Sequence, residues 1–184
     1  MNLTSEHVHW IFGVFLTIVP IVLLLHHGGA MRARWPIFII PVTFLLLSIE
    51  IVLEPLVHGN AAPAGYAPES AQHMMIATLA LAIAMIETGR ALGRLQAKVW
   101  AMALPSALVV IGLLFFFHAQ HQADVPMLLL MTQHRIMGVT LIVAGIAKAA
   151  GELTLKPELR IGWLLLILIF GIELLLYTEG QTLF

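Results

Sequence analysis

The residues of this chain whose types suit chemistry are histidines and glutamates set inside or beside long apolar stretches. Eight of them form the candidate set: Glu50, Glu54, His58, His73, His118, His121, His134 and Glu173. Neutral imidazole binds copper, zinc, iron and nickel, and carboxylate adds a harder ligand. The chain has no cysteine, which excludes disulfides, thiolate metal sites, iron–sulfur clusters and cysteine nucleophiles.

Helical spacing places several of these residues on shared faces. Glu50, Glu54 and His58 follow one another at intervals of four residues, so they drift only about 80° around a helix and can line one side of it. His118 and His121 are three residues apart, and this spacing lets two imidazoles share one metal ion.

The elements that must position these residues are membrane-spanning helices. Of the 184 residues, 60% are hydrophobic and 10% are charged, whereas about 25% of an average soluble domain is charged. A bilayer core about 30 Å thick needs roughly 20 helical residues per crossing. Six apolar stretches approach that length: 8–26, 36–57, 71–89, 99–118, 126–148 and 161–179. The sequence therefore predicts an all-α, six-helix transmembrane bundle that forms a single domain over residues 1–184.

Basic residues predict the orientation of this bundle, because cytoplasmic loops collect Lys and Arg. Eight of the nine fall on one side of the six-span arrangement: Arg32, Arg34, Arg90, Arg94, Lys98, Lys148, Lys156 and Arg160. Both termini are then expected on the outer side, which is the periplasm if the membrane is a bacterial inner membrane. The net charge of −1 leaves no basic stripe, so nucleic acid is not expected as a partner.

Ionisable residues at membrane depth mark the expected site. Such residues are costly in lipid, usually face the bundle interior, and often belong to a functional site. Seven of the nine histidines fall on the outer side, although His7 and His9, near the chain end, are expected to be solvated. Two structural explanations stay open: an ion pair of Glu50 or Glu173 with Arg135, and hydrogen bonds between helices made by single histidines.

A short internal repeat links three of the expected helices. Ala71-Gln72-His73 opens the third, Thr132-Gln133-His134 lies in the outer part of the fifth, and Ser5-Glu6-His7 opens the first. The chain is therefore interpreted as three related helical hairpins, and membrane-protein repeats often hold a ligand at their interface.

Outer histidines with glutamate and methionine, and without cysteine, favour a copper site. In this hypothesis the protein binds or handles copper, and the direct ligands are His73, His118, His121 and His134, together with His58. Glu50, Glu54 and Glu173 act as further ligands or orient the imidazoles. A periplasmic metal carrier, a membrane partner subunit and self-association are open as interactions beside the lipid bilayer.

The layout of histidines and of Met127 and Met131 at the outer helix ends resembles the CopD-type copper-resistance membrane proteins. The resemblance concerns general layout rather than a diagnostic motif. It implies a polytopic membrane protein that holds copper near its outer face.

Two other cofactor hypotheses stay open. The chain could be a b-type cytochrome for membrane electron transfer, in which His73 and His134, or either with His118, hold one haem iron from both sides. Several buried carboxylates beside the macrocycle would then lack an explanation. Alternatively, a His and carboxylate site with an open coordination position, holding iron, zinc or copper, would serve a membrane oxidase or oxygenase. A subunit whose polar layer only packs is the fourth alternative.

Overall fold

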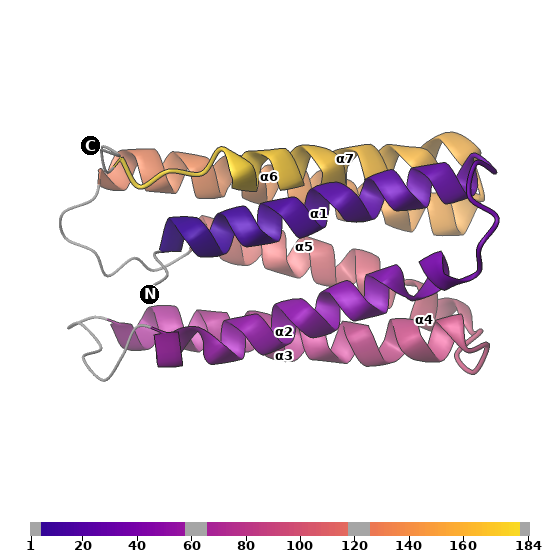
Figure 1. Cartoon of the computed structure of the whole chain (residues 1–184), viewed down its shortest axis with the longest axis horizontal. Helices are drawn as coiled ribbons and strands as arrows, with labels where there is room; N and C mark the ends of the chain where they lie inside the picture. Colours follow the sequence, from indigo (N-terminus) through magenta and orange to yellow (C-terminus); the bar gives the residue numbers. More distant parts are fainter. Residues whose placement is uncertain (1–4, 58–65, 118–125, 181–184) are drawn as a thin grey trace.

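The computed structural model describes residues 5–57, 66–117 and 126–180, and these residues form helices and turns without any strand. Figure 1 shows long helices that run antiparallel along one axis. They are α1 (Ser5–His27), α2 (Ile39–Val57), α3 (Tyr66–Ala91), α5 (Ala103–Phe116), α6 (Met127–Thr154) and α7 (Pro157–Leu175). The short η1 (Trp35–Phe38) leads into α2, and the short α4 (Lys98–Ala101) leads into α5.

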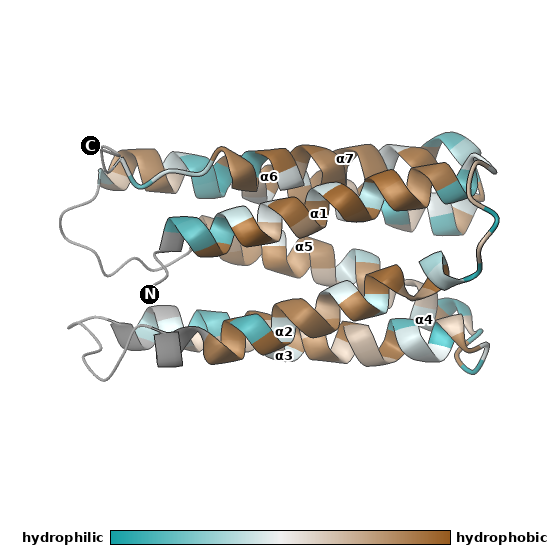
Figure 2. Cartoon of the chain, in the orientation of Figure 1, coloured by the Kyte–Doolittle hydropathy of each residue, from teal (hydrophilic) through white to brown (hydrophobic). Residues whose placement is uncertain are grey.

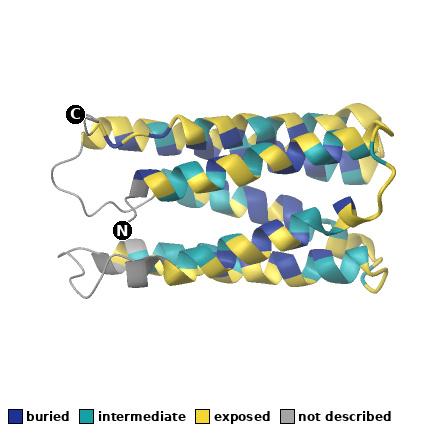
Figure 3. Ribbon diagram, in the orientation of Figure 1, coloured by how far each residue is buried: buried dark blue, intermediate teal, exposed yellow. Residues whose placement is uncertain are grey.

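The bundle is an integral membrane structure. Within the described residues, five helical segments are long and apolar enough to cross a bilayer, namely 6–27, 35–53, 70–91, 98–116 and 127–154. Apolar residues cover the middle of the helices in Figure 2, and many are exposed on the outer surface in Figure 3. Large apolar side chains facing outward suit a lipid environment, in which helices satisfy their own backbone hydrogen bonds. The sixth long helix, α7, carries Glu158, Arg160 and Glu173 among its 19 residues and is not one of the five.

Close contacts between glycines join helices within the bundle. α5 packs along α6, and α1 packs along α7, which also lies against α6. A Cβ atom added to Gly138 of α6 would lie 2.7 Å from the carbonyl oxygen of Gly112 on α5. A Cβ atom added to Gly13 of α1 would lie 2.9 Å from the carbonyl oxygen of Gly171 on α7. Small residues let membrane helices approach in this way. α2 packs mainly on α3, so these two helices form a separate pair.

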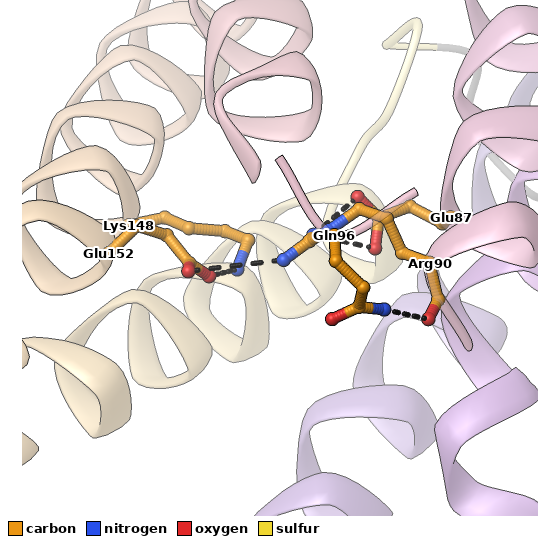
Figure 4. A network of polar contacts seen from close by, with 5 residues as sticks. All are labelled: Glu87, Arg90, Gln96, Lys148 and Glu152. Carbon is orange, nitrogen blue, oxygen red and sulfur yellow. Dashed lines mark hydrogen bonds and ion pairs between the residues drawn. The ribbon is translucent and has the colours of Figure 1, made fainter. Parts of the chain in front are cut away.

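Charged residues link α3 and α6 at the opposite end of the bundle from the chain termini (Figure 4). Arg90 Nη1 lies 2.8 Å from Glu87 Oε1, and Arg90 Nη2 lies 3.9 Å from Glu152 Oε2. Lys148 Nζ lies 2.9 Å from Glu152 Oε1 and 4.5 Å from the centre of the Trp163 ring. This end also carries the turns with most of the other Lys and Arg residues, as the basic-residue pattern predicts.

The last two helices differ from the expected ranges. The helix expected over 126–148 continues to Thr154, because Gly151 lies where the α7 backbone approaches closely, with Arg160 N 3.3 Å from an added Cβ. Leu155 then takes a left-handed conformation with φ of 58° and ends the helix. Pro157 starts α7, a position that suits a residue without a backbone N–H. The expected connection over 149–160 is therefore only two residues long.

The C-terminal helix ends at Leu175 instead of 179. Side chains from other helices bind the next backbone groups. Trp10 Nε1 donates to the carbonyl oxygen of Tyr177 at 3.0 Å, and Glu6 Oε1 accepts from Glu179 N at 2.6 Å. Gln133 accepts from the backbone N–H of Thr178 at 3.0 Å. Because these contacts satisfy peptide groups that the helix no longer pairs, the chain can leave the helix at this point.

Candidate functional site

A cavity of about 180 Å³ lies inside the bundle and is lined by residues from all six long helices. Its polar lining residues gather at the end where α1, α3 and α6 begin. They are His9, Glu50, His73, His134 and Tyr177. Apart from Thr43, the rest of the lining is apolar, tryptophan included. An enclosed apolar site with a few convergent polar groups is typical of a binding site for an organic ligand or cofactor.

His134 is held in one orientation. Its side chain is buried, with 4% of its surface exposed. Its Nδ1 lies 2.9 Å from the carbonyl oxygen of Leu130. Because a carbonyl only accepts, Nδ1 carries the proton in the neutral imidazole and Nε2 carries the lone pair. This is the arrangement of a metal-binding histidine, whose other ring nitrogen usually donates to a backbone or carboxylate oxygen.

Aromatic rings surround His134. The ring of His9 stacks on that of Tyr177, with centroids 3.8 Å apart and an angle of 12° between the planes. Both rings meet His134 edge-on, at 6.0 Å for His9 and 5.7 Å for Tyr177. Phe115 lies 5.8 Å from His134 on another side. These contacts fix the imidazole plane, and Tyr177 is itself fully buried with its hydroxyl 3.4 Å from Glu179 Oε1.

Two glutamines directly precede the two helical histidines and make matching contacts. Gln72 Nε2 donates to the carbonyl oxygen of Phe117 at 2.6 Å, and Gln133 Nε2 donates to that of Thr178 at 2.9 Å. In both cases the acceptor lies 45 residues after the glutamine, just beyond the end of a neighbouring helix. The glutamines therefore tie the ends of α5 and α7 to the helices that carry His73 and His134.

The cavity lining has a regular relation to the sequence. α1, α3 and α6 begin at residues 5, 66 and 127, each 61 residues after the one before. Positions related by this spacing line the cavity together: Phe12, His73 and His134, and also Val19, Ala80 and Leu141. On α2, α5 and α7 the corresponding sets are spaced by 61 and then 59 residues: Thr43, Leu104 and Trp163; Leu47, Leu108 and Ile167; Glu50, Ile111 and Phe170.

The structure brings together three of the residues predicted for the site, Glu50, His73 and His134. Glu173 is not in the cavity lining; its Oε1 accepts a hydrogen bond from Thr140 Oγ1 at 2.7 Å, between α7 and α6. The side chain of Glu54, and the residues His58, His118 and His121, lie outside what the structure describes. The predicted convergence of these histidines with the others stays a prediction.

Sequence reasoning missed His9 and Tyr177. The expectation that His9 is solvated is wrong, because α1 already begins at Ser5 and His9 lines the cavity. Tyr177 falls inside the range expected for the last helix, but its position depends on the turn that follows α7, which is set by residues distant in sequence. The signal that could have identified His9 is its position one helical turn before Phe12, whose 61-residue counterparts are the two site histidines.

The described residues contain no group of three or more His, Asp or Glu side chains that could hold a metal ion. A metal held only by these residues would therefore have to use two protein ligands. His73 and His134 provide such a pair, on different helices and in one cavity.

Comparison with known proteins gives no independent assignment. No family model, no curated protein and no solved structure matches the chain. The chemistry of the site therefore has to be argued from its own residues.

Proposed function

We propose that this integral membrane protein is a b-type cytochrome, in which His73 and His134 bind one haem iron from opposite sides. The observation that carries the proposal is that these two histidines occupy positions 61 residues apart on α3 and α6 and line the same cavity. Two axial imidazoles complete the protein ligand set of such a haem. His134 already has the orientation of a ligand, because its Nδ1 is used by the carbonyl of Leu130.

The choice between haem and copper rests on ligand number. A copper site of the kind favoured by the sequence needs further imidazoles, and the candidates His58, His118 and His121 lie outside the described residues. A haem needs only two. The main objection to haem, a surplus of carboxylates, is also weaker, because Glu173 bonds to Thr140 away from the cavity.

The walls of the cavity suit a porphyrin. Phe12, Phe115 and Phe170 line it from three helices, and its volume of about 180 Å³ exceeds the roughly 150 Å³ of an engineered cavity that binds benzene. A porphyrin is larger than benzene, so the helix pair α2 and α3 would have to move outward to admit it. This movement is physically accessible because these two helices pack mainly on each other.

The repeat interpretation supports the same pairing. The chain would consist of three helical hairpins, α1 with α2, α3 with α5, and α6 with α7, arranged around the cavity. The second and third hairpins each contribute Gln-His, and the first contributes Phe12 at the corresponding position. A ligand site at the interface between repeats is common in membrane proteins.

The proposed setting is a bacterial inner membrane, with six spans and with both termini and the histidine end of the cavity on the outer side. The support is the positive-inside rule, because eight of the nine Lys and Arg residues belong to the opposite side. Haem at this depth would exchange single electrons with a periplasmic or membrane redox partner.

The test is the cofactor content of protein purified in mild detergent. The expected result is one haem per chain, measured by its strong Soret absorption and by the pyridine haemochrome assay, with iron in equal amount and copper absent. As a matched pair, His73→Phe should lose the haem, whereas His26→Phe should retain it, because His26 lies at the other end of α1 and bonds to Met31 O. Bound copper without haem would overturn the proposal in favour of the copper hypothesis.

A further inference from the structure

The cavity continues from the histidines toward the opposite end of the bundle as an apolar extension, here named the inner arm. It is lined by Leu16, Val19, Phe44, Ala80, Leu104 and Trp163. Phe115, beside His134, and Leu104, deep in the arm, are 11 residues apart on one helix, which corresponds to roughly 16 Å. The inner arm therefore extends well beyond the groups that contact His134.

Water is a poor occupant for the inner arm. A buried water molecule needs two to four polar partners. The hydroxyl of Thr43, the polar side chain nearest to the arm, already donates to the carbonyl oxygen of Ile39 at 2.7 Å. An empty space is also unfavourable, because its lining atoms lose their packing contacts. A hydrocarbon chain satisfies both conditions, and the surrounding bilayer supplies such chains.

The charges in the lining select among amphiphiles. Among the described residues no Lys or Arg lines the cavity, and the carboxylate of Glu50 stands at its polar end. An anionic head group would therefore meet a like charge without a compensating base. A neutral head with hydrogen-bonding groups is compatible with His9 and Glu50, and a flat ring is compatible with the aromatic walls formed by Phe12 and Phe115.

We propose that the inner arm binds the hydrocarbon tail of a neutral, ring-headed membrane amphiphile, the chemical class of the isoprenoid quinones. This inference goes beyond the haem assignment and does not depend on it, because the arm and its lining are the same whether or not the histidines hold iron. Where both are correct, the arm brings a lipid-soluble electron carrier close to the haem.

The test is photolabelling of the complete purified protein with a decyl-ubiquinone whose tail ends in a photoreactive azide. We expect labelled peptides to map to the inner arm, at segments that include Ala80, Leu104 or Trp163, and unlabelled decyl-ubiquinone to compete. Ala80→Phe should lose the labelling because the larger side chain fills the arm. Ala82→Phe is the matched control, since Ala82 is exposed on the same helix, and it should label like the unaltered protein.

Labels scattered over lipid-facing residues such as Val110 and Ile136 would overturn the inference. So would competition by palmitate or phosphatidylglycerol that equals competition by the quinone, since the site would then select hydrocarbon alone. If Ala80→Phe does not fold, the map in the unaltered protein decides. The haem spectrum is read separately, so labelled arm without haem refutes only the cytochrome, and haem with scattered labels refutes only the arm.

Discussion

Replacing His134 with two different residues separates its role as a ligand from its role in packing. Phenylalanine keeps a ring of similar size and already stands at the related position, Phe12. Alanine removes the ring. If His134 is an axial ligand, both His134→Phe and His134→Ala should lose the haem, whereas only His134→Ala should destabilise the bundle strongly.

The structure sets the size of these effects. The His134 ring is buried and has edge contacts with the three rings of His9, Phe115 and Tyr177. Each such contact contributes about 0.5–1.5 kcal/mol beyond its buried area, and the alanine variant also leaves a cavity. We therefore expect His134→Ala to lower the free energy of unfolding by about 2–4 kcal/mol. His134→Phe loses mainly the hydrogen bond to Leu130, which costs about 0.6 kcal/mol on average in membrane helices.

The assay is a thermal or denaturant unfolding curve of each cofactor-free variant in the same detergent, with haem per chain measured in parallel on protein as purified. Comparing cofactor-free forms is necessary because a ligand that binds the folded state adds to its stability. Retention of haem at the unaltered level in His134→Phe would refute the role of His134 as a ligand. Equal stability losses in the two variants would refute the packing argument.

Three further variants test the arrangement around the cavity. Phe12→His should add a third imidazole at the histidine level and create a site for Zn²⁺, measured as metal retained per chain after dialysis; no gain would contradict the equivalence of the three positions. Gly138→Ala should lower the free energy of unfolding by about 1–3 kcal/mol, because its Cβ would lie 2.7 Å from Gly112 O. Gly162→Ala, with no atom within 4 Å of its Cβ, should instead be neutral or slightly stabilising; equal thermal midpoints would contradict this. Gln133→Leu should lower the thermal midpoint and weaken haem retention, because it frees the backbone of Thr178 from α6; unchanged haem retention would limit Gln133 to a structural role.

The helices and their direction could be predicted from the sequence because hydropathy and basic residues are local signals. The same holds for the pairing of His73 with His134, since each follows a glutamine in a similar position along its helix. The short repeat therefore indicates the two histidines that line one cavity, although its third copy is misaligned. The structure relates position 12, not His7, to the two histidines, and no histidine stands at position 12.

The remaining site residues depend on long-range contacts or on helical phase. Tyr177 reaches the cavity only because Trp10, Glu6 and Gln133 bind the backbone after α7. Glu173 shows the effect of phase. The side chains of α7 that line the cavity include Phe170 and Leu174, and Glu173 is one residue before Leu174, which turns it about 100° away. The apolar stripe of that helix, followed along the sequence alone, is therefore sufficient to place Glu173 outside the cavity.

The most direct test of the central claim is electron paramagnetic resonance of the oxidised, purified protein. The two axial imidazoles of a b-type cytochrome give the rhombic spectrum of low-spin ferric haem, and His134→Phe should convert that spectrum to a high-spin form or remove it with the haem. A Cu(II) spectrum with nitrogen hyperfine structure, or no iron signal in protein that is fully folded, would contradict the account and return the site to the copper hypothesis.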